Sequence, residues 1–355
     1  MAKQIFFDDF TGDSLNASMW SPTWGKFDPE KGTQMRFSDK NISVAKGILK
    51  LTGTVAEGTD AAKAPFLSGM VSTRKPDKGE VLFQAKGQFI LSVRAQMPYA
   101  FSSWPGIWMT GTKGDWPACG EIDVIEAKGW QSDDYQMNTH TPRAGDATGT
   151  KSQQFAKTFK KSGSAGKINI KDFFHTYSVV KLNELIHFYC DGRIIHTVRY
   201  SDMDDPTPFT NPENGWVIRL SYIIGGQFLD SGGTEEGHDK YVDATKFKEQ
   251  FPSSMLVDYV RVISLDEPGT VDVLSDGIDL ASKYAYVAPQ PQPEPPVVVP
   301  PTPQPQPEPP VVVPPTPQPP VVVPPTPTPE PTPAPRPRGK NDWVREEEAL
   351  VFIML

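Results

Sequence analysis

Three carboxylates lie within one short apolar stretch, Glu121-Ile122-Asp123-Val124-Ile125-Glu126. Acidic side chains are poor strand formers, and like charges on one face of a sheet repel each other, so such a run is costly unless it does chemistry. Two carboxyl groups beside a glycosidic bond can cleave it: one protonates the leaving oxygen, and the other attacks or stabilises the sugar carbon. The run therefore indicates glycosidic-bond hydrolysis. The alternatives are an exposed strand face and a cation site.

A regular strand does not place these three acids together. Side chains alternate between the two faces, so Glu121 and Asp123 share a face while Glu126, five positions after Glu121, points the other way. A β-bulge at Val124-Ile125 restores the phase, and it directs Ile122 and one bulge residue into the core. We then expect the two glutamates about 5 to 5.5 Å apart, the spacing of retaining glycosidases. One acid stays protonated beside its neighbours' charges, and Asp123 tunes and orients the pair, but the residues alone do not tell nucleophile from acid.

Aromatic and basic residues around the acids are candidates for substrate binding. Flat tryptophan rings can stack on sugars, although tryptophan is also a core residue; the candidates are Trp104, Trp108, Trp116 and Trp130. His140 follows the acids by one strand and a turn, and we expect it to hydrogen-bond Asp123 or the acid, with a purely structural role as the alternative. Another histidine, His175, is expected to satisfy a turn.

The first 270 residues read as an all-β domain. Short stretches of alternating or β-branched residues, broken by Gly, Asp, Asn and Pro, predict strands at 48–52, 89–95, 176–180, 185–190, 216–224 and 255–263. Asp191-Gly192 between two apolar runs predicts a hairpin turn. Many antiparallel strands with little helical periodicity favour a sandwich of two curved sheets, a β-jelly roll.

The C-terminal part has a different composition. Of the 38 prolines, 25 lie between Pro289 and Pro337, where Pro-Pro-Val-Val-Val-Pro-Pro-Thr-Pro occurs three times. Proline lacks the amide donor, so residues 289–338 are expected to form an extended polyproline II segment about 150 Å long. We interpret residues 271–288 as a connector and residues 289–338 as a solvated linker. The alternative is that residues 289–338 tether the domain to a surface or bind a proline-binding partner. Residues 339–355 are expected to form either a short helix or a disordered end.

Composition excludes several other classes. A net charge of −8 disfavours nucleic acid as a partner. The apolar runs are too short to cross a bilayer, and the sequence as given begins without an export signal. Two cysteines, Cys119 and Cys190, are too few for a disulfide framework or a four-ligand zinc site. We expect a monomer that requires no cofactor.

The chain resembles glycoside hydrolase family 16 across about residues 5–265, in its laminarinase-like (endo-β-1,3-glucanase) branch. Glu121-Ile122-Asp123-Val124-Ile125-Glu126 is similar to that branch's acid motif with one inserted residue. Further matches are Phe7-Asp8-Asp9-Phe10, Ser68-Gly69-Met70-Val71-Ser72-Thr73-Arg74, Val93-Arg94-Ala95-Gln96-Met97-Pro98, Trp104-Pro105-Gly106-Ile107-Trp108-Met109, Phe174-His175-Thr176-Tyr177, Phe188-Tyr189-Cys190-Asp191-Gly192 and Met255-Leu256-Val257-Asp258-Tyr259-Val260-Arg261-Val262.

The resemblance implies roles that the residues alone leave open. It implies Glu121 as nucleophile, Asp123 as assisting carboxylate and Glu126 as acid/base, with substrate lying across the concave sheet. Arg74 joins the substrate-binding candidates, and many relatives hold a structural calcium ion whose ligands nothing in this sequence locates. The sequence departs from the family at Ser92, Lys181 and Ser221, where Glu, Trp and Asn are usual.

The function that the resemblance implies is endo-hydrolysis, with retention, of β-1,3- or mixed β-1,3-1,4-glucan. Alternatives are an agarase- or carrageenase-type enzyme, a virion- or surface-mounted depolymerase of a charged polysaccharide, and a non-catalytic carbohydrate-binding module. Such a polysaccharide substrate places the protein outside the cell, at a cell surface or on a virion.

Overall fold

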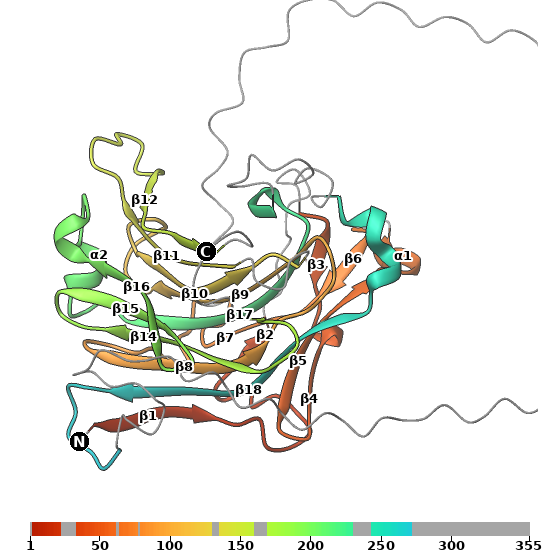
Figure 1. Cartoon of the computed structure of the whole chain (residues 1–355), viewed down its shortest axis with the longest axis horizontal. Coiled ribbons are helices and arrows are strands. Elements are labelled where there is room, and N and C mark those ends of the chain that lie inside the picture. Colours follow the sequence, from red (N-terminus) through yellow and green to blue (C-terminus); the bar gives the residue numbers. More distant parts are fainter. Residues whose placement is uncertain are drawn as a thin grey trace, which may run out of the picture. The chain divides into compact units, whose positions relative to one another are not determined.

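Two β-sheets packed face to face make up the part of the chain seen in the computed structural model (Figure 1). The structure describes residues 2–22, 33–61, 64–76, 79–129, 135–159, 169–229 and 243–271. Most of the predicted connector, the proline-rich segment and the last residues lie outside these ranges, so the expectations for them stay predictions.

The first sheet has ten strands and forms the lower layer in Figure 1. Their spatial order is β16 (Arg193–Arg199), β15 (Leu185–Cys190), β14 (His175–Lys181), β8 (Phe89–Gln96), β18 (Ser253–Ser264), β5 (Ile48–Val55), β6 (Phe66–Ser68) and β3 (Met35–Phe37), with β1 (Lys3–Asp8) beside β18 and β4 (Ile42–Ala45) beside β5.

The second sheet has eight strands, and the strand with the three acids lies in its middle. The order is β12 (Ser152–Gln154), β11 (Tyr135–Pro142), β10 (Glu121–Ala127), β9 (Ser103–Gly111), β17 (Trp216–Ile224), β7 (Met70–Ser72) and β2 (Ser21–Pro22), with β13 (Lys157–Phe159) also beside β11. Among the described strands every pair is antiparallel except β3 with β6.

Alternation of side chains explains why the two sheets pack on each other. On β8, Leu91 and Val93 point into a core that also contains Ile107 and Met109 of β9, whereas Ser92 between them points outward and contacts Ser178. All six strands expected from the sequence are present, and the expected hairpin turns at Asp191-Gly192 with φ of 49° and 75°. The prediction of an antiparallel sandwich is confirmed.

Helices are short in the described residues and do not cover the sheets. They are α1 (Gly58–Ala61), α2 (Thr207–Thr210) and the 3-10 segments Asp39–Asn41, Tyr200–Asp202, Gln227–Leu229 and Ala244–Gln250. None of the helices seen in the described part of the chain is long and apolar enough to span a membrane.

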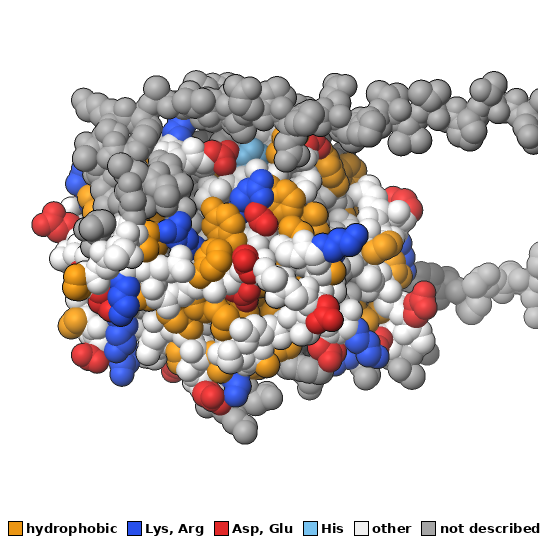
Figure 2. Space-filling view, turned by 90° about the horizontal axis from the view of Figure 1, so that it is seen from below, with side chains coloured by type: hydrophobic (Ala, Val, Ile, Leu, Met, Phe, Trp, Pro, Cys, Tyr) orange, Lys and Arg blue, Asp and Glu red, His pale blue; other side chains and the backbone are white. Residues whose placement is uncertain are grey.

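The described residues on the outward face of the ten-stranded sheet carry charges of both signs. Figure 2 shows acidic and basic side chains interspersed among apolar ones on the side where β1 and β18 lie. Arg94 and Asp258 form an ion pair there, and Ile90, Val180 and Ile263 make a second, smaller apolar cluster on this face. The acids of β10 lie on the opposite side of the molecule, on the face of the eight-stranded sheet that points away from the shared core.

The central position of β8 makes one substitution a direct test of this packing. Leu91 is fully buried between Val179 and Val262 of the neighbouring strands, so Leu91→Ala is expected to lower the free energy of unfolding by about 2–5 kcal/mol. Ile194→Ala is the matched control, because Ile194 is 39% exposed and should cost no more than about 0.5 kcal/mol. Denaturant unfolding measures both, and equal costs would contradict the assigned core.

Candidate active site

A β-bulge in β10 brings the three acids to one face, as the sequence predicts. Opposite β9, Asp123 pairs with Trp108 and Ile125 pairs with Ile107, so Val124 is the extra residue. Opposite β11, Asp123 and Glu126 are three positions apart while their partners, Asn138 and Gln136, are two apart. Ile122, Val124 and Ile125 are all fully buried in the core, where the sequence indicated Ile122 and only one of the bulge residues.

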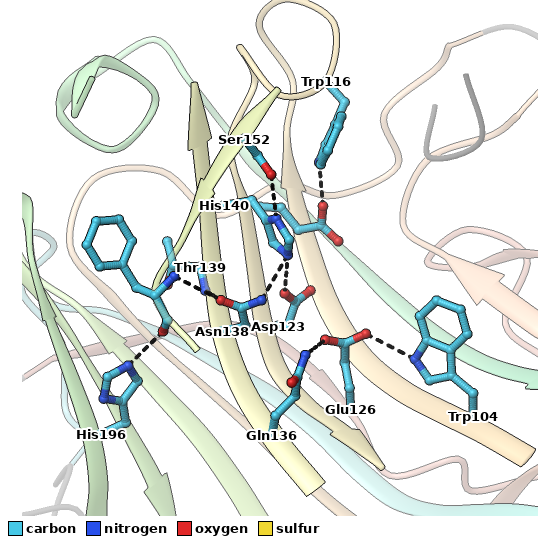
Figure 3. Close-up of polar contacts among 12 residues, drawn as sticks. Trp104, Trp116, Asp123, Glu126, Gln136, Asn138, Thr139, His140, Ser152 and His196 are labelled. Carbon is cyan, nitrogen blue, oxygen red and sulfur yellow. Dashed lines mark hydrogen bonds and ion pairs between the residues drawn. The ribbon is translucent and has the colours of Figure 1, made fainter. Parts of the chain in front are cut away.

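Glu126 is held by two neutral hydrogen-bond donors (Figure 3). The indole N–H of Trp104 donates to Oε1 at 3.0 Å, and the Gln136 amide donates to Oε2 at 2.8 Å. The Trp104 ring in turn stacks on Phe228, with ring centroids 4.7 Å apart. Trp104 therefore orients a carboxyl group, and the sugar stacking expected from its sequence position stays a prediction.

Glu121 has a similar partner on the other side of the acid row. The indole N–H of Trp116, from the loop before β10, donates to Glu121 Oε2 at 2.6 Å. The Trp116 ring lies 5.9 Å from the ring of His140, centroid to centroid, and His140 pairs with Glu121 across β10 and β11. Each glutamate is thus fixed by one tryptophan N–H.

His140 and Asp123 form the middle of the site, and the hydrogen bonds around them assign the tautomer. Asn138 Oδ1 accepts from the backbone N–H groups of Thr139 and Phe155, so Asn138 Nδ2 donates to His140 Nε2 at 3.0 Å. A ring nitrogen that accepts carries no proton, which places the proton on Nδ1, 3.1 Å from Ser152 Oγ. His140 Nε2 also lies 3.2 Å from Asp123 Oδ2, an oxygen that no N–H or O–H group of the described residues reaches with hydrogen-bond geometry.

Burial dominates the protonation of all three acids. Glu121, Asp123 and Glu126 are 2%, 2% and 9% exposed, and loss of water raises the pKa of each. The charge of Asp123 raises the pKa of Glu121 further, and the charge of Glu126 does the same to the pKa of Asp123. The Gln136 and Trp104 hydrogen bonds act in the opposite direction and lower the pKa of Glu126. The row therefore keeps a proton at a higher pH than isolated carboxyl groups would.

The remaining predicted binding residues are placed in different ways. Trp108 lies on the acid-bearing face, donates its indole N–H to Ser221 at 3.1 Å, and has the Arg219 guanidinium over its ring at 4.9 Å. Arg74 follows β7, near Arg219, whose pKa its charge helps to lower. Trp130 lies outside the described residues. The binding roles of all these residues stay predictions.

Several site residues were not singled out from the sequence. Gln136, Asn138 and Ser152 come from β11 and β12 and contact the acids or His140 across the sheet, and Thr110 accepts from Arg219 Nε at 3.2 Å. For most of them the sequence contains no local signal, because a polar residue of the site cannot be told from a polar residue on any solvent-exposed strand. Arg219 is the exception: a charge inside the apolar run Trp216–Ile224 is a signal that could have identified it.

Among the residues that the structure describes, two clusters of three groups have atoms close enough to share a metal ion: Glu121 with Asp123 and His140, and His175 with Cys190 and Asp191. Calcium prefers a set of oxygen ligands, and each cluster contains a histidine, so neither fits that ion. His175 instead bonds Asp191 at 2.6 Å and the Asn169 carbonyl at 2.9 Å, which ties the hairpin to a loop, as expected from the sequence. The calcium ion implied by the resemblance stays a prediction.

A bulged strand with three buried acids, on the outward face of an antiparallel sandwich, defines a glycosidase-like fold and site. Residues 24–175 match the model of the XgeA-like, catalytic domain of glycoside hydrolase family 16. Over these residues the chain is similar to the catalytic domain of glycoside hydrolase family 16.

Individual relatives agree with this family. The glucan endo-1,3-beta-glucosidase A1 of Niallia circulans is 26% identical over 284 residues, which are 73% of this chain but 37% of that protein's own length. The beta-porphyranase B of Phocaeicola plebeius is 26% identical over 248 residues, 62% of this chain and 75% of that protein. The structure of the laminarinase from Rhodothermus marinus superposes with a TM-score of 0.58 at 21% identity, covering 74% of this chain and 97% of that one. The shared fold is the jelly roll.

The Trp104 hydrogen bond predicts a shift in the pH profile of any activity that uses Glu126 as its acid. The indole N–H stabilises the ionised carboxylate, so Trp104→Phe is expected to raise the pKa of Glu126 and move the alkaline limb of kcat/KM to higher pH, with a lower maximum. Trp20→Phe is the matched control, because Trp20 donates the same kind of bond to Asp8 on β1, away from the site. An unchanged alkaline limb in Trp104→Phe would contradict this assignment.

Proposed function

We propose that this protein is an endo-acting, retaining hydrolase of β-1,3-glucan or mixed β-1,3-1,4-glucan. One observation carries the proposal: Glu121, Asp123 and Glu126 are buried side by side at the bulge of β10, each with a raised pKa. Buried acids at such close quarters are costly for stability, and glycosidic-bond cleavage is the chemistry that uses them.

The contacts support a division of labour between the two glutamates. In the first step the Glu121 carboxylate attacks the anomeric carbon while the proton of Glu126 passes to the leaving oxygen, which gives a glycosyl ester on Glu121 and a shortened polymer. In the second step Glu126, now ionised, takes a proton from the water that attacks the ester, and Glu121 leaves as a carboxylate. The Trp104 and Gln136 hydrogen bonds stabilise the ionised form of Glu126 that this second step requires.

Asp123 serves both steps from the middle of the row. It lies 3.2 Å from His140 Nε2, so a proton can be held on this pair rather than on Glu121. Its charge, when present, raises the pKa of Glu121, and its protonation therefore favours the ionised nucleophile. A proton can in this way move between the carboxyl groups of the row without a base from outside the row.

The substrate is proposed from the relatives together with the site. The Niallia relative is named for 1,3-β-glucan and the Rhodothermus structure for laminarin, which favours a β-1,3-linked glucan. The porphyranase relative, at the same 26% identity, makes a galactan of the agarase or porphyranase type the second candidate. A polymeric substrate of either kind places the protein outside the cell or at its surface, with the proline-rich segment as spacer.

Reducing-sugar release from a panel of polymers tests the proposal. We expect the full chain to act on laminarin, on barley mixed-linkage glucan, or on both, and expect Glu121→Gln and Glu126→Gln each to lower kcat at least about a thousandfold. Agarose, porphyran and κ-carrageenan complete the panel. Proton NMR of the first products reports the anomeric configuration, and retention is the expected result.

The controls separate loss of chemistry from loss of fold. Glu213→Gln removes a carboxylate whose side chain is exposed and which, among the described residues, forms an ion pair with Lys86 alone, at 3.7 Å. The activity of this variant should match that of the unaltered protein. A protein that binds laminarin without cleaving any polymer would overturn the proposed hydrolysis and indicate a binding module. An inverted product would contradict the double displacement alone.

A further inference from the structure

Two arginines, Arg74 and Arg219, lie beside the acid row. Arg219 is only 7% exposed, yet neither it nor Arg74 forms an ion pair with any residue that the structure describes. By contrast, Arg94 on the outward face of the other sheet pairs with Asp258. A buried charge normally has a partner, because its removal from water is costly.

The strand register places Arg219 on the acid-bearing face. Arg219 pairs with Trp108 on β9, and Trp108 pairs with Asp123 on β10, so the Arg219 backbone is two strands, about 10 Å, from that of Asp123. Its Nε atom donates to Thr110 Oγ1, and its guanidinium lies over the Trp108 ring at 4.9 Å. These two contacts fix the plane of the guanidinium.

The terminal nitrogens of Arg219 remain free for a ligand. Among the described residues, Nε makes the one hydrogen bond of this side chain, and the two Nη atoms are not among the buried atoms that lack a partner. They therefore reach the open side of the face. Burial lowers the pKa of Arg219, and the positive charge of Arg74 adds to this effect, so that the pKa is about 10. The Arg219 guanidinium is therefore still charged at neutral pH, and it lies near the like charge of Arg74.

Two neighbouring guanidinium groups, of which that of Arg219 is held by Thr110 and Trp108, are suited to bind an oxyanion. A guanidinium presents its N–H groups as a planar fork that binds carboxylate or sulfate oxygens in pairs, and such charge-assisted bonds are stronger than those to hydroxyl groups. We propose that Arg219 and Arg74 form a subsite for an acidic substituent, a uronate carboxylate or a sulfate ester, carried by the polysaccharide. The subsite lies on the Glu121 side of the acid row, about one strand spacing beyond Trp108. This inference rests on the proposed function and names the class of substrate more narrowly.

A competing role for Arg219 is to stabilise the ionised form of Glu121. The two charges attract each other, and Thr110, which holds Arg219, pairs with Glu121 across β9 and β10. That role would affect neutral and acidic substrates alike. It also leaves Arg74 unexplained, because the charge of Arg74 acts on Arg219 and no contact of Arg74 with the acids is present in the described residues.

The test measures binding separately from hydrolysis. Three polymers of the same backbone are used: laminarin, laminarin oxidised at C6 to glucuronate, and laminarin sulfated to the same degree. Dissociation constants are measured by calorimetry on the full chain carrying Glu126→Gln, alone and combined with Arg219→Met, Arg74→Met or Arg94→Met. Arg94→Met is the matched control, since it changes the net charge equally on the far sheet.

We expect at least one charged polymer to bind about tenfold tighter than laminarin, with an advantage that falls as salt is added. Arg219→Met and Arg74→Met should each remove most of this advantage and leave laminarin binding within about twofold, whereas Arg94→Met should keep it. Preference for the oxidised or the sulfated polymer tells which acidic group is read.

Equal binding of charged and neutral polymers would overturn the subsite, as would an equal loss of both in Arg219→Met. A shift of the acid limb of the pH profile in Arg219→Met, with the charge preference intact, would assign Arg219 to Glu121 instead. Failure of the proposed hydrolysis is a separate result: the protein carrying the native Glu126 would then cleave none of the three polymers, whatever the binding preference.

Discussion

The bulge in β10 is the constraint on which the site depends. One extra residue, Val124, turns Glu126 to the face that Glu121 and Asp123 already occupy, and sends three aliphatic side chains into the core beneath. The same residue therefore couples packing to chemistry: the core holds the strand from below, so the acids above cannot move apart to relieve their mutual repulsion.

Neighbouring elements orient the acids with hydrogen bonds from neutral donors. Trp104, Trp116 and Gln136 each donate one N–H to a glutamate, and the Asn138 amide holds His140 beside Asp123. A lysine at any of these positions would form a salt bridge and hold the acids ionised. Neutral donors orient the carboxyl groups while their pKa values stay raised, so a proton remains within the row at the pH of use.

The sequence predicts the fold and the acid row because both depend on local patterns. Alternation gives the strands, Asp191-Gly192 gives the hairpin, and the five-residue step from Glu121 to Glu126 requires a bulge. The partners of the acids depend on register between strands, which no local pattern fixes. Trp104 and Trp116 were selected for their rings, whereas their N–H groups make the contacts with Glu126 and Glu121; only the structure distinguishes these two uses of one side chain.

The departures from the family's usual residues have unequal consequences. Ser92 and Lys181 lie in the ten-stranded sheet, where Ser92 bonds Ser178 and Lys181 bonds the Gly87 carbonyl, away from the acids. Ser221 lies on the acid-bearing sheet and accepts the indole N–H of Trp108. The N–H of Trp108 is engaged by Ser221 and one face of its ring is covered by Arg219, so Trp108 supports the guanidinium. In the proposed subsite, recognition at this end of the site consequently relies on the charge and hydrogen bonds of the guanidinium that Trp108 supports.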